Sequence, residues 1–200
     1  MARRGCVPTP SAPRHSGRAL GVLCFMATGR SNQITKQIGE YLVASELGRI
    51  GLVAATFSGN VPDYDIIATD SAFHSVPVQV KTTNGTSWQF GDMRRFVDVG
   101  LDRKKQVIGR PVALSDSIVC VMLALFRYGK DRFYVLSLKA LQEVLIKHYR
   151  SDLEKRGGVR PKKFDSFHCA IGQEELAPFE NAWIPEFRDK RGLSVHDLSA

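Results

Sequence analysis

Cysteine and tryptophan are scarce in this chain, which contains four and two of them among 200 residues. The cysteines show neither the paired spacing of a zinc site nor the clustering of a disulfide framework, so we expect reduced thiols. They are Cys6, Cys24, Cys120 and Cys169. The sequence also has no Gly-rich phosphate-binding loop and no internal repeat. These absences exclude zinc-finger, disulfide-stapled, P-loop and repeat proteins.

Long hydrophobic runs are missing as well. Residues 19–27 are apolar, but this run is too short to span a bilayer and makes a poor signal sequence, so we expect a cytoplasmic protein with no membrane partner. Residues 1–30 are rich in Pro, Ser, Arg and Gly and predict a disordered basic tail, with Met26 as an alternative start of the natural chain. Residues 31–190 suffice for one domain, and 191–200 are expected to form a C-terminal tail.

Acidic residues are outnumbered, 20 against 28 Lys and Arg, but the net charge of +8 is unevenly distributed. Residues 1–30 hold five arginines and no acidic residue, so overall charge is weak support for nucleic-acid binding by the domain. A local cluster of basic residues is more informative, because it closely follows the segment 62–83, which carries candidate site residues. It includes Arg94, Arg95, Arg103, Lys104 and Lys105. These side chains predict contacts to a phosphate backbone, and the alternative is an ordinary solvated surface.

The most informative segment lies between residues 62 and 83. Asp65 directly precedes one apolar run, and Gln79 and Lys81 alternate with valines in a second run. Alternate residues of a strand point to the same side, so Gln79 and Lys81 should project together while the valines face the core. If the two runs pair as a hairpin, Asp65 comes to lie beside them. The alternative for Lys81 is an edge strand whose lysine points into water.

Residues 31–50 predict a helix that ends near two glycines. One apolar face of this helix is formed by Ile34, Ile38, Leu42 and Leu47. Glu40 lies with Val43, Ala44 and Leu47 on a second face that is also expected to be buried. A helix carboxylate, a strand aspartate and a strand lysine suit phosphodiester chemistry, because oxygen donors hold hard divalent cations. The alternative for Glu40 is a solvated position paired with Lys36, one helical turn earlier.

Together these residues resemble the motif of the PD-(D/E)XK nuclease superfamily. The resemblance rests on Gly39-Glu40 in the helix, Pro62-Asp63-x-Asp65 before the first strand and Gln79-Val80-Lys81 in the second. It covers residues 31–90, and the chain is most similar to Holliday-junction-resolvase-like and uncharacterised bacterial nuclease domains. It implies an α/β protein with a restriction-endonuclease-like core, in which helices flank a central mixed β-sheet of about four to five strands.

The resemblance implies a metal-dependent DNA endonuclease that hydrolyses phosphodiester bonds with Mg²⁺ or Mn²⁺. Asp65, Gln79 and Glu40 would hold the metal ion, and Lys81 would stabilise charge at the scissile phosphate. Asp63 is an alternative ligand, and its other interpretation is a turn residue. Position 79 departs from the family pattern, which has Asp or Glu there. A glutamine oxygen still binds a hard cation but removes one negative charge, and similar Gln-x-Lys variants occur in the superfamily.

Two other functions stay open on the sequence. A catalytically inactive, nuclease-like DNA-binding protein would follow if Gln79 weakens metal binding. A non-enzymatic α/β interaction module of a defence or toxin system would follow if the basic residues are only a solvated surface. For the nuclease, the resemblance also implies a homodimer, because restriction and junction enzymes that cut two strands are usually dimers.

The later half of the chain predicts further sheet and helix. A hairpin, a long helix, a short strand and a short helix are expected at residues 118–126 with 132–136, 138–154, 166–171 and 174–180, respectively. Trp88 and Phe90 follow the motif directly. Stacking on a base is one role for such aromatic side chains, but packing in the core is the preferred interpretation.

Overall fold

The computed structural model describes residues 29–57 and 61–196 of the chain. Except for its last two residues, the expected basic tail lies outside the described residues, as do Met26, Cys6 and Cys24. No helix in the described part of the chain is long and apolar enough to cross a membrane.

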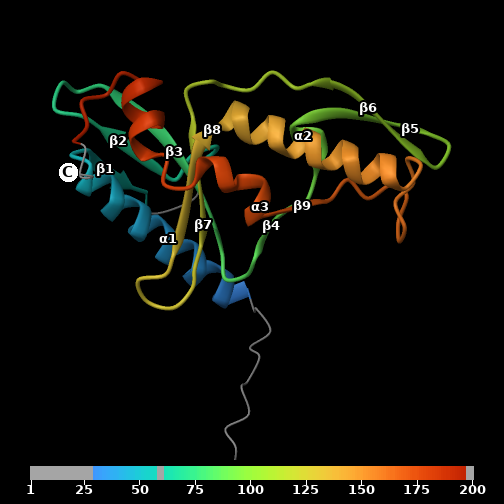
Figure 1. Cartoon of the computed structure of the whole chain (residues 1–200), viewed down its shortest axis with the longest axis horizontal. Coiled ribbons are helices and arrows are strands. Elements are labelled where there is room, and N and C mark those ends of the chain that lie inside the picture. The colour runs from blue at the N-terminus through green and yellow to red at the C-terminus, as the bar shows by residue number, and fades with distance from the viewer. Residues whose placement is uncertain (1–28, 58–60, 197–200) are drawn as a thin grey trace, which may run out of the picture.

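A five-stranded mixed sheet forms the centre of the fold (Figure 1). Its strands, in spatial order, are β1 (Val53–Thr56), β2 (Ile66–Thr69), β3 (Ser75–Thr83), β7 (Val119–Ala124) and β8 (Arg132–Ser137). Only β3 and β7 run parallel, and the other neighbours are antiparallel. The predicted α/β class with a central mixed sheet is therefore confirmed. Lys81 lies in β3, the middle strand, so the interpretation of an edge strand with a protective lysine is wrong.

The sheet is covered on both faces, and the buried valines of β3 belong to the cluster on one of them. Val78 and Val80 pack in one hydrophobic cluster with α1 (Gly29–Arg49) and the π-helical turn η3 (Pro185–Asp189). The other face packs against α2 (Leu138–Lys155). In Figure 1, α1 with β1–β3 occupies one half of the molecule and α2 the other. Lys81 lies on the opposite side of β3 from these valines, against Phe90 of the second cluster, which is an unusual environment for a lysine.

Only one of the two predicted apolar faces of α1 is buried. Val43 and Leu47, on the face shared with Glu40, have no exposed surface, whereas Ile34 is 49% and Ile38 is 43% exposed. The expectation that the Ile34 face is also buried is wrong. The physical reason is that the sheet lies against only one side of this helix, and residues about half a helical turn apart point in opposite directions.

The other predicted elements are present close to their expected positions. The hairpin β7–β8 and helix α2 are followed by β9 (Cys169–Gly172), α3 (Gln173–Leu176) and the 3₁₀ turn η2 (Ala177–Phe179). Strand β9 pairs with β4 (Ser87–Phe90) in a small separate sheet. Trp88 is 1% and Phe90 is 7% exposed, so the preferred interpretation of both as core residues is confirmed.

An antiparallel ribbon was not foreseen from the sequence. It consists of β5 (Val97–Asp102) and β6 (Lys105–Pro111), which follow the 3₁₀ turn η1 (Met93–Arg95). Gln106 anchors it, because its amide nitrogen donates to the carbonyls of Phe164 and Ser166 while Tyr149 of α2 contacts its amide oxygen. The ribbon runs beside α2 toward the end of the molecule (Figure 1).

The chain after residue 190 still packs on the body of the protein. Leu193 is 2% exposed, the Ser194 amide donates to Asp70 Oδ2 at 3.0 Å, and the His196 amide donates to the Ile50 carbonyl at 2.8 Å. Cys120 and Cys169 are buried free thiols, and burial raises the pKa of each to about 12. Both thiols are therefore protonated and unreactive near neutral pH.

Candidate functional site

The Asp65 carboxylate is fixed against the middle strand. The Asp65 amide donates to the Val78 carbonyl at 2.9 Å, and the Val80 amide donates back to Asp65 Oδ2 at 2.8 Å. The hairpin predicted from the two apolar runs is present, with Ile66 of β2 opposite Val78 of β3. Asp65 therefore lies across from Gln79, and its second oxygen, Oδ1, stays available for a cation.

Helix α1 brings a second carboxylate to the same place. The Lys36 ammonium lies 3.0 Å from Asp65 Oδ1 and 3.5 Å from Glu40 Oε1. The side chains of Glu40 and Asp65 are each 14% exposed, whereas that of Lys36 is 51% exposed. The expected pairing of Glu40 with Lys36 is therefore present, but it does not leave Glu40 on a solvated flank. One cation joins the helix carboxylate to the strand carboxylate.

A glycine allows the helix to approach β3 this closely. Gly39 is buried, and a Cβ atom at this position would lie 1.8 Å from Thr82 Oγ1. Any larger residue would push the helix away from the strand. Thr82 Oγ1 is itself buried and has no hydrogen-bond partner among the described residues. The contact between Gly39 and Thr82 sets how closely α1 approaches β3. Glu40 follows Gly39 in the helix, and Lys81 precedes Thr82 in the strand, so this contact fixes the spacing of the two elements that carry them.

Lys81 is half-buried on the other face of β3. Its ammonium lies 4.8 Å from the centre of the Phe90 ring, and its carbonyl accepts from Trp88 Nε1 at 2.8 Å. Burial lowers the pKa of Lys81, the nearby Arg95 charge lowers it further, and Asp65 opposes both effects. A positive charge in surroundings of low dielectric constant acts on a bound anion more strongly than it would in water.

Gln79 supplies a neutral oxygen. It lies opposite Asp65 and two residues before Lys81 in β3. It precedes Val80, whose amide is held by Asp65, and its side chain lines the same cleft as Lys81. The Cys120 thiol lies 3.9 Å from Gln79 Oε1, which is a long and weak contact. Gln79 therefore keeps an oxygen that can take part in binding a ligand in the cleft.

The donor set suits a hard divalent cation. Glu40, Asp65 and Gln79 offer only oxygen atoms, as Mg²⁺ and Mn²⁺ prefer, and the two carboxylates already share one cation, the Lys36 ammonium. In residues 29–57 and 61–196, no group of three or more His, Cys, Asp or Glu side chains is placed to hold a metal. A metal here would depend on two carboxylates, a neutral oxygen and water.

Burial raises the pKa of Glu40, and the neighbouring Asp65 charge adds to this effect, while Lys36 opposes it. Its carboxylate is therefore easier to protonate than that of an exposed glutamate. Asp63, the alternative ligand, is exposed and has a φ of 72°, which fits its expected role in a turn. It lines the cleft, but Asp65 is the residue that contacts Lys36 and Val80.

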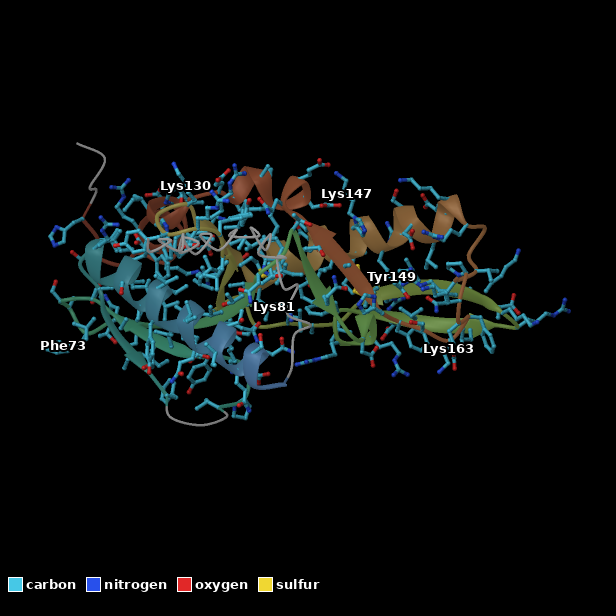
Figure 2. The ribbon with its side chains drawn as sticks, turned by 90° about the horizontal axis from the view of Figure 1, so that it is seen from below. Phe73, Lys81, Lys130, Lys147, Tyr149 and Lys163 are labelled. Carbon is cyan, nitrogen blue, oxygen red and sulfur yellow. The ribbon has the colours of Figure 1, made fainter. Side chains whose placement is uncertain are left out.

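A cleft of about 860 Å³ lies between the sheet and the segments 90–96 and 113–118, which flank the ribbon, and Glu40 is not among the residues that line it. Its charged and polar lining includes Lys36, Asp63, Asp65, Gln79, Lys81 and Arg95, and its apolar lining includes Ile118, Met122 and Leu141. Figure 2 shows Lys81 near the middle of the molecule, between the half that contains α1 and the half that contains α2. The cleft is open and large enough to admit a sugar-phosphate backbone.

The predicted nucleic-acid-binding cluster is divided by the fold. Arg94 donates to both oxygens of Asp92 and lies over the Phe167 ring, so its guanidinium is already engaged. Arg95 lines the cleft. The other three members, Arg103, Lys104 and Lys105, are exposed at the tip of the β5–β6 ribbon.

Two features of the site were missed in the sequence. Lys36 appeared there only as a partner of Glu40, and its contact with Asp65 joins residues 29 positions apart. Gly39 formed part of the motif, but its contact with Thr82 was not anticipated. The i, i+4 spacing of Lys36 and Glu40 was the available signal for the first feature. Nothing in the sequence indicated the second.

No family model and no curated protein matches the chain. Among solved structures it is similar to a bacterial homing endonuclease, I-Ssp6803I, with a TM-score of 0.48 and 12% sequence identity. The match covers 81% of this chain and 97% of that one. A likeness of this size does not assign the chain to a family or an activity.

Proposed function

We propose that this protein is a metal-dependent endonuclease that hydrolyses phosphodiester bonds in DNA. The observation that supports it best is the convergence of Glu40 and Asp65 on one cation, the Lys36 ammonium, at a cleft that Lys36, Asp65 and the half-buried Lys81 of the middle strand line together. A carboxylate pair for a cation and an ammonium for a phosphate are the groups that such a reaction requires.

Asp65, Glu40 and Gln79 would hold Mg²⁺ or Mn²⁺, with Asp63 at the cleft wall as the alternative ligand. When bound, the ion would neutralise phosphate charge and lower the pKa of a bound water. The chain itself positions the ligands: the Val80 amide orients Asp65, and the close contact of Gly39 places Glu40. Gln79 replaces a carboxylate, so this site has less negative charge than one with three carboxylates.

Lys81 would bind the scissile phosphate and stabilise the negative charge that develops on it. Lys81 is half-buried beside Phe90, so its interaction with phosphate oxygen is stronger than that of a fully exposed lysine. Arg95 lines the same cleft and adds positive charge next to it. Arg103, Lys104 and Lys105 would contact the DNA backbone farther from the site, without reading its sequence.

Two further proposals follow from the reaction. Cutting both strands of a duplex requires two active sites, so we expect a homodimer. We also expect the protein to act in the cytoplasm, where thiols such as those of Cys120 and Cys169 stay reduced.

The direct test is cleavage of supercoiled plasmid and of a four-way junction by the full chain in Mg²⁺ or Mn²⁺. The wild type should cleave, and Lys81→Ala and Asp65→Ala should not, while Arg94→Ala, whose guanidinium is engaged by Asp92, should retain cleavage. EDTA should stop the reaction. Cleavage that survives both site substitutions would exclude this site.

Gln79 favours a second candidate, a DNA-binding protein that does not cleave. In that case the full chain would shift DNA in a gel without cutting it, and calorimetry would detect no saturable Mg²⁺ or Mn²⁺ binding. The interaction-module alternative predicts a different result: heparin retention would disappear when residues 1–30 are deleted, because DNA affinity would then belong to that segment alone.

A further inference from the structure

The Lys36 ammonium lies between the two carboxylates of the proposed metal site. It is the group that contacts Asp65 Oδ1, the oxygen that the Val80 amide does not use. The same ammonium reaches Glu40 Oε1 at 3.5 Å. Lys36 therefore binds the two negatively charged oxygen ligands that the proposed cation would need.

Lys36 and a divalent cation cannot both make these contacts without repulsion. Two positive charges that share the same carboxylate oxygens lie within a few ångströms of each other, where Coulomb repulsion is strong even at a protein surface. Asp65 Oδ2 is already held by the Val80 amide, so Oδ1 is the oxygen for which the two cations compete. A bound metal must therefore displace the ammonium from Asp65.

Displacement is feasible because Lys36 is only partly enclosed. Its side chain is 51% exposed, so the ammonium can move from the carboxylates into water, where it is fully hydrated. Both ion pairs of its ammonium are with carboxylate oxygens of the proposed metal ligands, so Lys36 competes directly with a metal ion for them.

We propose that Lys36 is a built-in counter-cation of the metal site: it neutralises Asp65 and Glu40 in the metal-free protein and must be displaced by the divalent ion. This inference rests on the proposed metal site and concerns its regulation. Lys36 stabilises the metal-free protein, because it joins two carboxylates that would otherwise repel each other. For the same reason it weakens metal binding, so a higher metal concentration is needed to fill the site.

Arg49 provides a matched control on the same helix. It forms an i, i+3 ion pair with Glu46, with 3.1 Å between Arg49 Nη1 and Glu46 Oε1, at the opposite end of α1. Lys36→Met and Arg49→Met remove the same charge from the same element, so both change the net charge equally. Only Lys36→Met removes a charge from the proposed metal ligands.

The experiment is calorimetric titration of the full-length wild type, Lys36→Met and Arg49→Met with MnCl₂, together with thermal unfolding in EDTA and in Mn²⁺. Lys36→Met should bind Mn²⁺ about tenfold more tightly than the wild type, or tighter still, because a competing charge is gone. It should also have a lower melting temperature in EDTA and a larger rise in Mn²⁺. Arg49→Met should bind Mn²⁺ like the wild type.

Equal or weaker Mn²⁺ binding by Lys36→Met would overturn the inference and leave the metal site standing. No saturable binding by wild type, Lys36→Met or Lys36→Gln would overturn both. Tighter binding by Lys36→Met in a protein that never cleaves DNA would support the inference and reject the nuclease activity. Lys36→Gln serves as the second variant should methionine at this half-exposed position impair folding.

Discussion

Gly39 of α1 and Thr82 of β3 are in such close contact that a Cβ atom on Gly39 would lie 1.8 Å from Thr82 Oγ1 and 2.9 Å from Thr82 Cβ. A β-branched threonine cannot move its whole side chain aside, so relief has to come from the backbone. Gly39→Ala should therefore push α1 away from β3. We expect a loss of about 1–3 kcal/mol in the free energy of unfolding, measured with urea.

Gly48 is the control for Gly39, because it lies in the same helix and a Cβ there would meet nothing within 4 Å. Gly48→Ala should stabilise the protein by about 0.5–1 kcal/mol, through the higher helix propensity of alanine. Thr82→Ala added to Gly39→Ala should recover part of the loss. Equal effects of alanine at positions 39 and 48 would mean that the close contact does not exist in solution.

Lys81→Met should separate catalysis from stability. The cleavage rate should fall by about a hundredfold to a thousandfold, because a charge that stabilises the reacting phosphate is lost. The melting temperature should stay the same or rise, because the folded protein no longer has to bury an ammonium. Plasmid cleavage and thermal unfolding of the same samples test both effects. Parallel losses of activity and stability would indicate a merely structural lysine.

The lowered pKa of Lys81 also has a consequence at alkaline pH. Lys81 loses its proton below the ordinary lysine value of 10.5, so cleavage that needs the ammonium should decline at a lower pH than an exposed lysine would dictate. Lys81→Arg keeps its charge throughout this range. Any residual cleavage by Lys81→Arg should therefore lack this alkaline decline.

Asp65→Asn and Asp65→Ala should differ in their free energy of unfolding, but both should lose metal binding. Asparagine keeps an oxygen that can accept from the Val80 amide, whereas alanine leaves this amide without its 2.8 Å partner. Alanine should therefore cost about 1–3 kcal/mol more in urea unfolding. Both variants should abolish saturable Mn²⁺ binding in calorimetry. Wild-type affinity in Asp65→Asn would show that the metal ligand is another residue, with Asp63 the next candidate.

Much of the central fold was predictable because local patterns specify it. The alternation of valines in β3 fixed which residues face which side, and Asp65 before the apolar run placed the carboxylate at the start of β2. The predicted site residues Glu40 and Asp65 meet at one cation in the structure. The relations within β2 and β3 follow from strand period and hairpin pairing, whereas the contact of Lys36 with Asp65 depends on how α1 packs against the sheet.

The remaining features depend on packing between distant segments. The sequence pattern of α1 offers two apolar faces, and only the position of the sheet decides that the face of Val43 is buried and that of Ile34 is not. Arg94 and Arg95 are adjacent in the basic cluster, but Asp92 binds the first and leaves the second at the cleft. Such choices are made by tertiary contacts, which no local pattern records.

Glu40 makes the metal site sensitive to acid in a way that can be measured. Burial raises its pKa above the ordinary 4.5, so in the metal-free protein the folded state holds this proton more tightly than the unfolded state. The contribution of Glu40 to stability therefore falls as pH rises from 4.5 through the raised value. Metal binding has the opposite trend, because the carboxylate must be charged to hold the ion.

We expect Mn²⁺ affinity to decrease as pH falls through the raised pKa of Glu40, at a higher pH than for an exposed glutamate. Glu40→Gln should bind Mn²⁺ more weakly at neutral pH and lose this part of the pH dependence, whereas Glu46→Gln, which alters the ion pair with Arg49 on the same helix, should behave like the wild type. Calorimetric titrations between about pH 5 and pH 7.5 test this. An unchanged pH profile in Glu40→Gln would remove Glu40 from the metal ligands and leave Asp65, with Asp63 as the alternative, to supply the carboxylate of the site.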